Sequence, residues 1–462
     1  MGLTQMHEYL IIYTFAIFAL TTLFIMWRPH GINEAIPALS GALLLFIAGV
    51  VPFSDILQIF KIVSGPSITI ISTIVMCIVL ESIGVFRWAA INIVNRVKGS
   101  GIKLFFYIIL LCFLMTVFFN NDGSILITTP IIIHIISMLH LKPHQKYPYF
   151  FTGVFIATSA SLPIGVSNIA NLIGLKMVGL DLISYTHFAF VPSMIGISTL
   201  CLLLYLLFKK DIPKNITTLN DQSIELFVSN QKQGIQSHPL SLSGEMNSPE
   251  TINWSLFRVC ILLVVLIRGS YFVLPAFGIP IEVIAITGAV ILIVVRWISL
   301  KVGVLDVIKK APWHILIFAF GMYVTVYALN NTGVTTFFIE LLKEAMQDNL
   351  VFASFTSGLL VSVLSNVMNN LPSVMLGTLI ITDMGLDLHT LQVSYISIII
   401  GSDIGALLSP MGTLATLLWM FVLRKNGIDI SWSKYFKVAL MVIPITLMVT
   451  LIALNLWLLL IT

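Results

Sequence analysis

The sequence predicts an all-α polytopic membrane protein built from two inverted-topology repeats. Of its 462 residues, 58% are hydrophobic and 10% are charged, whereas soluble domains carry about 25% charged residues. Its apolar runs reach the roughly 20 residues that a helix needs to cross a bilayer. Polar breaks with Asn, Gly and Pro interrupt these runs and recur in the second half at a nearly constant spacing. The composition therefore places the chain in a bilayer, and the spacing indicates an internal duplication.

Helices are the only structure expected for these runs, because a backbone in lipid must satisfy its own hydrogen bonds. Residues 1–208 form the first half, with expected spans at 8–27, 35–51, 66–86, 149–177 and 188–208. Residues 254–462 form the second half, with expected spans at 254–274, 281–297, 312–331, 392–423 and 435–460. The spans 149–177 and 392–423 contain Pro and Gly and are expected to be broken helices. Pro66 is expected in the first turn of its helix, where proline is tolerated.

Two further stretches are expected to be re-entrant hairpins. Two carboxamides and a carboxylate, Asn120-Asn121-Asp122, interrupt the apolar stretch 104–140, and such groups in a membrane mark functional sites. Basic connectors flank this stretch on both sides, which places both of its ends in the cytoplasm. The break recurs at 365–373, inside the stretch 352–381, where the flanks are acidic. The second hairpin should therefore enter from the other side, giving about ten spans in all and both chain termini outside.

Residues 209–253 are the only long polar segment of the chain. The segment is rich in Ser, Asn and Gln and poor in aromatic residues. Such a composition cannot bury enough apolar surface to fold by itself. We expect a flexible cytoplasmic linker that joins the two halves.

Charged side chains inside the apolar runs are the first candidates for function. Asp122 and Asn370 each precede a resumed helix, where an N-cap residue belongs, so each side chain could serve only to cap its own half-helix. Asp403 has no basic residue within one helical turn. Burial favours the protonated form of a carboxyl group, so Asp403 is a candidate for proton exchange. Arg268 also lies inside an apolar run and is a candidate counter-ion for one of the carboxylates.

Other polar residues of the apolar runs are expected to be structural. The four cysteines are scattered through apolar runs and are expected to be buried small hydrophobes. Glu81 is expected to pair with Arg87, and His134 and His314 are expected to be packed or interfacial.

Several classes of function are disfavoured by what the chain lacks. It has no phosphate-binding loop, no catalytic constellation and no metal-ligand spacing, so neither an enzyme nor a resident cofactor is expected. The small net charge of +4 does not suggest nucleic acid. No cluster of Arg or Lys flanks either tip, so a multiply charged anion would find little compensation. A small neutral polar solute or a cation fits better.

The breaks carry specific motifs: FFNNDGSILITTP at 118–130, SNVMNNLPSVMLG at 365–377 and GSDIGALLSPMGTLATLLW at 401–419. These motifs resemble those of bacterial arsenite efflux permeases, the arsenical pump membrane protein (ArsB) family of the ion transporter superfamily. The last of the three is the most specific. The resemblance extends in layout over the whole chain apart from 209–253, and the break at 161–165 is its least diagnostic part.

The resemblance implies export of arsenite and antimonite across the bacterial cell membrane, driven by the proton gradient. Some members of the family associate with a soluble ATPase. The positions that match the family's substrate-binding motifs are Asn120, Asn121, Asp122, Asn366, Asn369, Asn370 and Thr413. We expect Asp122 and Asp403 to couple transport to protons, because a neutral substrate brings no charge of its own, and to approach one another beside the two tips. Arsenite at neutral pH is mostly As(OH)3, which carboxamides and hydroxyls can bind through hydrogen bonds.

Other functions remain open at this stage. A sodium/proton antiporter of the same superfamily would use the same carboxylates for Na+. A dicarboxylate or other anion carrier would use the helix N-termini at the hairpin tips. A membrane enzyme or a structural anchor is the interpretation with least support, because no catalytic constellation is present.

The cysteines provide a test of how the substrate is bound. If As(III) is held through oxygen and amide groups, then replacing Cys77, Cys112, Cys201 and Cys260 together by Ala or Ser should leave arsenite export largely intact. Export is measured in cells that contain equal amounts of the variant and the unmodified protein. Complete loss of export by a well-expressed variant would instead favour a thiolate site.

Overall fold

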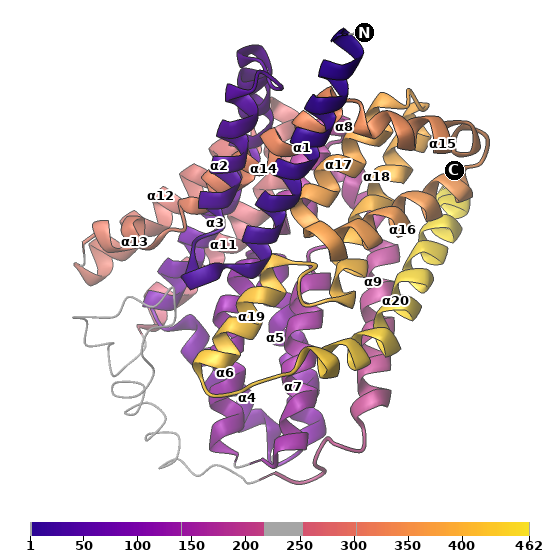
Figure 1. Ribbon diagram of the computed structural model, residues 1–462. Helices are drawn as coiled ribbons and strands as arrows, with labels where there is room; N and C mark the ends of the chain where they lie inside the picture. Colours follow the sequence, from indigo (N-terminus) through magenta and orange to yellow (C-terminus); the bar gives the residue numbers. More distant parts are fainter. Residues whose placement is uncertain (1, 140, 217–252, 302, 462) are drawn as a thin grey trace.

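The computed structural model describes residues 2–139, 141–216, 253–301 and 303–461, and all regular structure in these ranges is helical. Eleven of the described helices or helix pairs are long and apolar enough to cross a membrane. The helices pack into one elongated bundle, with segments of the two halves side by side (Figure 1).

The helices of the first half are α1 (Gly2–Trp27), α2 (Ala35–Ile47), α3 (Phe53–Ser82), α4 (Val85–Val97), α5 (Gly101–Phe118), α6 (Asn121–Met138), α7 (Pro143–Ser159), α8 (Ile169–Val178) and α9 (Leu182–Phe208). Those of the second half are α11 (Trp254–Val273), α12 (Ile281–Leu300), α13 (Leu305–Lys310), α14 (His314–Asn331), α15 (Val334–Asp348), α16 (Leu350–Met368), α17 (Asn370–Asp383), α18 (Leu388–Asp403), α19 (Leu414–Lys425) and α20 (Trp432–Ile461). Short 3-10 turns, η2 (Gly165–Ser167) and η4 (Gly405–Leu408), lie in the two broken spans.

One expectation about an individual element was wrong. Helix α3 begins at Phe53, so Pro66 lies inside the helix and not in its first turn. The helix continues past this proline, and packing against α12 supports the segment. The connector after 86 and the acidic stretch after 333 are also helical, as α4 and α15. Both helices begin after a glycine with a left-handed backbone, Gly84 and Gly333.

Contacts between helices occur in matched pairs. Helix α2 packs on α14, and its counterpart α12 packs on α3. Helix α8 packs on α17, and its counterpart α19 packs on α6. Helices α9 and α20 pack on one another (Figure 1). Each half therefore contacts the other through equivalent elements, as a duplicated chain with internal symmetry would.

The backbones of α16 and α18 come into close contact where the two helices cross, and this crossing positions the second broken span. A Cβ added to Gly401 of α18 would lie 2.1 Å from the carbonyl oxygen of Gly358 on α16. Real Cβ atoms do not approach so closely, so the crossing requires glycine at this point. Small residues serve this purpose in membrane helix packing. The crossing brings the end of α18, with Asp403, against the hairpin of α16 and α17.

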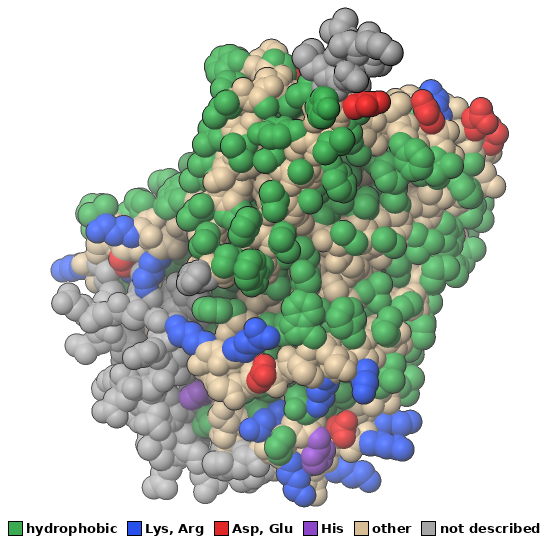
Figure 2. Space-filling view, in the orientation of Figure 1, with side chains coloured by type: hydrophobic (Ala, Val, Ile, Leu, Met, Phe, Trp, Pro, Cys, Tyr) green, Lys and Arg blue, Asp and Glu red, His purple; other side chains and the backbone are tan. Residues whose placement is uncertain are grey.

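The two ends of the bundle differ in charge. Lys and Arg side chains gather on the lower part of the molecule, whereas Asp and Glu side chains appear at its upper end, around α15 (Figure 2). The exposed acidic residues of α15 are Glu340, Glu344 and Asp348. Both labelled chain ends lie in the upper half, on the same side as α15 (Figure 1). This arrangement agrees with a cytoplasmic lower end, since basic residues gather on that side of a membrane.

The start of the expected linker belongs to the folded part of the protein. The backbone N–H of Ile216 donates to the carbonyl of Gly99 at 2.8 Å, so residues 209–216 return to the turn between α4 and α5. The rest of the expected linker, 217–252, lies outside the described residues.

Topology can be tested with single cysteines in a variant whose native cysteines are replaced. Lys210 and Gln347 are both exposed, and they lie near the basic and the acidic end. An impermeant thiol reagent added to intact cells should label a cysteine at Gln347 and not one at Lys210. Labelling of Lys210→Cys from outside, with Gln347→Cys protected, would contradict this orientation.

Candidate transport site

The first tip is a helix-to-helix turn capped by Asn120. Helix α5 ends at Phe118, and the side-chain oxygen of Asn120 accepts a hydrogen bond from the backbone N–H of Gly123 at 2.9 Å. The N-cap is therefore Asn120, and the expectation that Asp122 occupies this position was wrong by two residues. Asp122 lies in the first turn of α6, half-buried. Among the described residues, no hydrogen bond to its carboxylate is found, so the carboxylate is not committed to capping.

The second tip is capped by Asn369 and tied to the second broken span. Asn369 has a φ of 79° and a ψ of 156°, a strained backbone conformation that residues other than glycine rarely adopt. Its oxygen faces the N–H of Leu371 at 3.5 Å, and its side-chain nitrogen donates to the carbonyl of Met411 at 3.2 Å. Asn370 was expected to be the N-cap of α17. It is instead the first helical residue, and Asn369 is the N-cap.

Asn366 makes a second connection between the same two elements. Its side-chain nitrogen donates to the carbonyl of Gly405 at 2.8 Å, and its oxygen accepts from the N–H of Ser409 at 2.7 Å. Both partners lie in the break between α18 and α19, where the regular α-helical hydrogen bonds are interrupted. Asn366 and Asn369 therefore hold the tip and the break in a fixed arrangement.

Asp403 is fully buried and is bound by side chains from the other half. Its carboxylate accepts hydrogen bonds from the hydroxyl of Ser161 at 2.7 Å and from the side-chain nitrogens of Asn168 and Asn171 at 2.9 Å and 2.8 Å. All three donors belong to the first broken span, between α7 and α8 or at the start of α8. A buried carboxylate is tolerated only when it is fully hydrogen-bonded, so this contact aligns the two breaks.

Sequence reasoning did not place Ser161, Asn168 and Asn171 in the site. The signal available was that all three are polar residues inside an apolar span that contains Pro163 and Gly165. Asn168 also caps α8, since its oxygen accepts from the N–H of Ala170 at 3.1 Å. A capping role alone would have explained Asn168, and only the fold reveals its second hydrogen bond to Asp403.

Thr413 occupies the equivalent cap of α19. Its hydroxyl accepts from the N–H of Thr416 at 3.0 Å and lies 2.8 Å from the hydroxyl of the same residue. Thr413 is fully buried. Thr413 therefore serves as the N-cap of α19.

Arg268 lies at the first tip, where no basic residue was expected. Its Nε donates to the carbonyl of Phe118 at 2.5 Å, and its Nη2 donates to the carbonyl of Phe119. These carbonyls end α5, where the helix dipole is negative. The side chain is buried, with 8% of its surface exposed. Arg268 therefore pairs with freed backbone carbonyls, and neither of these two hydrogen bonds is to a carboxylate.

Besides the hydroxyls of Thr158 and Ser159 at the end of α7, four buried polar atoms at the tips and breaks have no hydrogen-bond partner in the described structure. They are Asn120 Nδ2 of the first tip, Ser365 Oγ beside the second tip, Asn171 Oδ1 of the first break and Ser409 Oγ of the second break. Unpaired buried polar groups are rare, and they gather at functional sites. This set contains a donor, an acceptor and two hydroxyls that can act as either.

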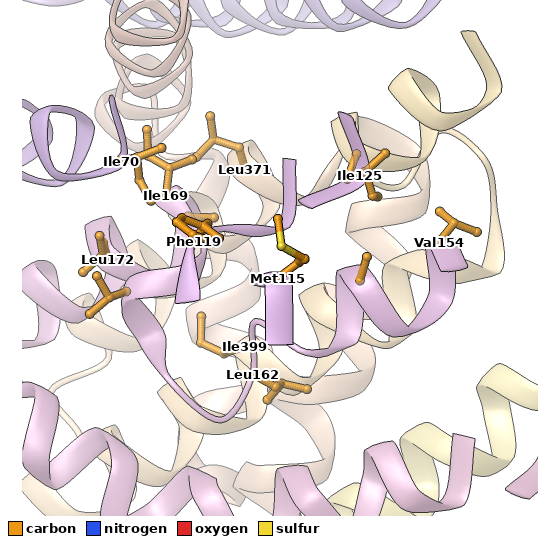
Figure 3. Close-up of a cluster of buried hydrophobic side chains, with 14 of the residues drawn as sticks. Ile70, Met115, Phe119, Ile125, Val154, Leu162, Ile169, Leu172, Leu371 and Ile399 are labelled. Carbon is orange, nitrogen blue, oxygen red and sulfur yellow. The ribbon is translucent and has the colours of Figure 1, made fainter. Parts of the chain in front are cut away.

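The tips and breaks also carry buried apolar side chains. Phe119 of the first tip, Leu371 of the second tip and Leu162 of the first break belong to one cluster of buried hydrophobic side chains (Figure 3). Ile169 of α8 and Ile399 of α18 belong to the same cluster. Apolar side chains of the two tips and of the first break thus belong to the buried core of the bundle.

No metal centre is formed by the part of the chain that the structure describes, since no three His, Cys, Asp or Glu side chains gather there. Cys77, Cys112 and Cys260 are buried, Cys201 is half-buried, and none forms a disulfide. The tips and breaks offer two carboxylates, the half-buried Asp122 and the buried Asp403.

The role of Arg268 at the tip can be tested by its effect on stability. Arg268→Gln leaves the carbonyls of Phe118 and Phe119 without their partner, which should cost about 1–3 kcal/mol. The measurement is thermal unfolding of the purified protein in detergent. Arg258→Gln on the exposed face of the same helix is the matched control. Equal unfolding temperatures for the two variants would contradict the anchoring role.

Comparison with known proteins agrees with this architecture. The chain matches the family described as "ArsB: Arsenical pump membrane protein" over residues 13–233 and 243–458. It is 45% identical to a putative arsenical pump membrane protein of Bacillus subtilis, over 95% of this chain and 98% of that protein. It is 33% identical to an arsenical pump membrane protein of Escherichia coli, over 96% of this chain and 97% of that protein.

Among solved structures, the chain resembles the YdaH transporter of Alcanivorax borkumensis. The TM-score is 0.55 at 13% sequence identity, over 95% of this chain and 98% of that one. This likeness shows the fold alone, that of a polytopic helical membrane protein. The family match and the sequence identities over nearly the whole length show more: the protein is a multi-pass membrane transporter, not an enzyme, and it belongs to the arsenical pump membrane protein (ArsB) family.

Proposed function

We propose that the protein exports arsenite and antimonite from the cytoplasm in exchange for protons. The observation that carries the proposal is the contact of Asp403 with Ser161, Asn168 and Asn171. It joins the two broken spans beside the polar tips, and in transporters built from repeats such breaks form the substrate site. The family of the chain supplies the class of substrate.

The unpaired polar atoms at the tips and breaks support a neutral hydroxylated substrate. As(OH)3 presents three hydroxyl groups, each able to donate and accept a hydrogen bond. Asn120 Nδ2 can donate to such a group, Asn171 Oδ1 can accept from one, and the hydroxyls of Ser365 and Ser409 can do either. Antimonite has the same pattern of hydroxyl groups, so the same atoms would serve it.

The donors around Asp403 weigh against a sodium ion at this position. A cation such as Na+ is bound by oxygen atoms, whereas Asn168 and Asn171 direct their side-chain nitrogens toward the carboxylate. This arrangement suits an ionised or proton-exchanging carboxylate. It favours proton coupling over the sodium/proton alternative.

Asp122 and Asp403 are proposed as the coupling groups because a neutral substrate brings no charge of its own. Asp122 has no hydrogen bond to its carboxylate among the described residues and is partly exposed, so it can exchange a proton with solvent. Asp403 accepts bonds only from neutral donors, so a proton there must displace one of them. Protonation of Asp403 would thereby change the contact between the two halves.

The architecture proposed for transport is a pair of inverted-topology repeats, 1–208 and 254–462. The matched packing of α2 on α14 and of α12 on α3 supports it. In this arrangement α5–α6 and α16–α17 are the re-entrant hairpins, α7–α8 and α18–α19 are the broken helices, and the tips meet near the bilayer midplane.

Coupling is tested in everted membrane vesicles, with and without an imposed pH gradient. Asn at either carboxylate keeps shape and hydrogen bonding but cannot titrate. Asp403→Asn should abolish metalloid accumulation against a gradient, while downhill exchange of metalloid survives. Asp122→Asn should likewise abolish accumulation against a gradient and keep downhill exchange. If both single variants keep full proton-driven uptake, neither carboxylate is the coupling site and the proposal fails.

A further inference from the structure

We propose that Tyr185 and Tyr395 are positioning residues of the transport site, which hold the two ends of the first break so that its side chains reach Asp403. The inference rests on the proposed function, because it concerns the same contact between the two breaks. The hydroxyl of Tyr185 donates a hydrogen bond to the carbonyl of Leu162 at 2.7 Å, and the hydroxyl of Tyr395 donates to the carbonyl of Asn171. The two tyrosines are here called the tyrosine pair.

The tyrosine pair holds both ends of the segment that binds the carboxylate of Asp403. One donor to this carboxylate, Ser161, directly precedes Leu162, and another is the side chain of Asn171. Most of the chain between these two points lies outside the α-helices. Helical hydrogen bonds therefore do not fix the distance between the two donors, and the two phenol groups supply that constraint.

The rings of the tyrosine pair are packed in the core of the bundle. Both side chains are fully buried, and their ring centroids lie 6.3 Å apart. A Cβ added to Gly174 of α8 would lie 2.7 Å from the ring of Tyr395, and one added to Gly165 would lie 3.4 Å from the ring of Tyr185. Rings packed so closely cannot move without displacing the break or α8. The two hydroxyls therefore occupy fixed positions.

Asn171 is bound twice by the same helix, α18. Its side-chain nitrogen donates to Asp403 at the end of α18, and its backbone carbonyl accepts from Tyr395 of α18. The remaining polar atom of its side chain, Oδ1, is buried and has no partner in the described structure. Under the proposed function this oxygen accepts a hydrogen bond from the substrate. Tyr395 thus acts on the substrate through the position of Asn171.

A tyrosine also bonds the second break, which indicates that such contacts are a repeated feature of the fold. The hydroxyl of Tyr435 on α20 donates to the carbonyl of Leu407 at 3.0 Å, as Tyr185 on α9 does to the first break. The counterpart of α18 differs. On α7 the buried Tyr149 donates to the carbonyl of Gly101 at 3.2 Å, at the far end of α5 from the first tip. Tyr149 is therefore a matched control for Tyr395.

The test measures arsenite counterflow in everted vesicles, at equal pH on both sides and with the amount of protein in the membrane determined. Tyr395→Phe keeps the packed ring and removes only the hydroxyl. The half-saturating arsenite concentration should rise about threefold to tenfold, the effect of one neutral hydrogen bond, while the maximal rate is unchanged. Tyr185→Phe releases the other end of the break and should also raise it. Tyr149→Phe should leave it at the value of the unmodified protein.

A purely structural role of the hydroxyls predicts a different result. Tyr395→Phe and Tyr149→Phe would then lower the unfolding temperature alike and leave the half-saturating concentration unchanged, and the proposal would be wrong. If Tyr395→Phe does not reach the membrane, Tyr185→Phe decides by the same criterion.

A double-mutant comparison tests whether Tyr395 acts through Asn171. In the background of Asn171→Ala, the amide through which the hydroxyl acts is absent, so adding Tyr395→Phe should raise the half-saturating concentration no further. A further rise as large as in the unmodified background would overturn the positioning role.

The same measurements separate this inference from the proposed function. If the unmodified protein shows no arsenite counterflow, the proposed function fails and the inference fails with it. If counterflow is normal and both Tyr185→Phe and Tyr395→Phe keep the unmodified half-saturating concentration, only the role of the tyrosine pair fails.

Discussion

The buried carboxylate of Asp403 is the constraint on which the rest of the site depends. A carboxylate at this depth is unstable unless each of its oxygens is hydrogen-bonded, and the donors come from Ser161, Asn168 and Asn171 of the other half. Both spans must therefore be interrupted at the same depth in the bundle, so that the side chains of one break reach those of the other. The glycine crossing of α16 and α18 brings Asp403 to that level.

Helix ends inside a membrane need caps, because no water is available to satisfy them. The structure provides one cap at each tip and each break: Asn120, Asn168, Asn369 and Thr413. Two of these caps have further bonds that join separate elements, from Asn168 to Asp403 and from Asn369 to the carbonyl of Met411. Capping and assembly of the site are therefore performed by the same side chains. This explains why carboxamides, which can donate and accept together, prevail at these positions.

The two halves match in how their helices pack but differ in where their charged side chains lie. Asp122 stands two residues after the cap Asn120, where the second tip has Leu371 two residues after Asn369. Arg268 binds the carbonyls of the first tip, whereas the tie of the second tip to its break comes from neutral Asn366 and Asn369. The packing is thus duplicated while the charged groups are not.

The sequence by itself determined three things. It showed that the chain crosses a bilayer, at which residues its apolar helices are interrupted, and to which family it is related. These properties follow from local composition and short motifs, such as the Asn120–Asp122 run and the 401–419 stretch. It did not place the caps correctly, since Asp122 and Asn370 were expected to cap and Asn120 and Asn369 do so. Only the tertiary structure decided which polar groups meet. The contact of Asp403 with Ser161 and the placement of Arg268 at the first tip join residues far apart in the chain. Such contacts depend on how helices of the two halves pack, and hydropathy carries no information about that choice.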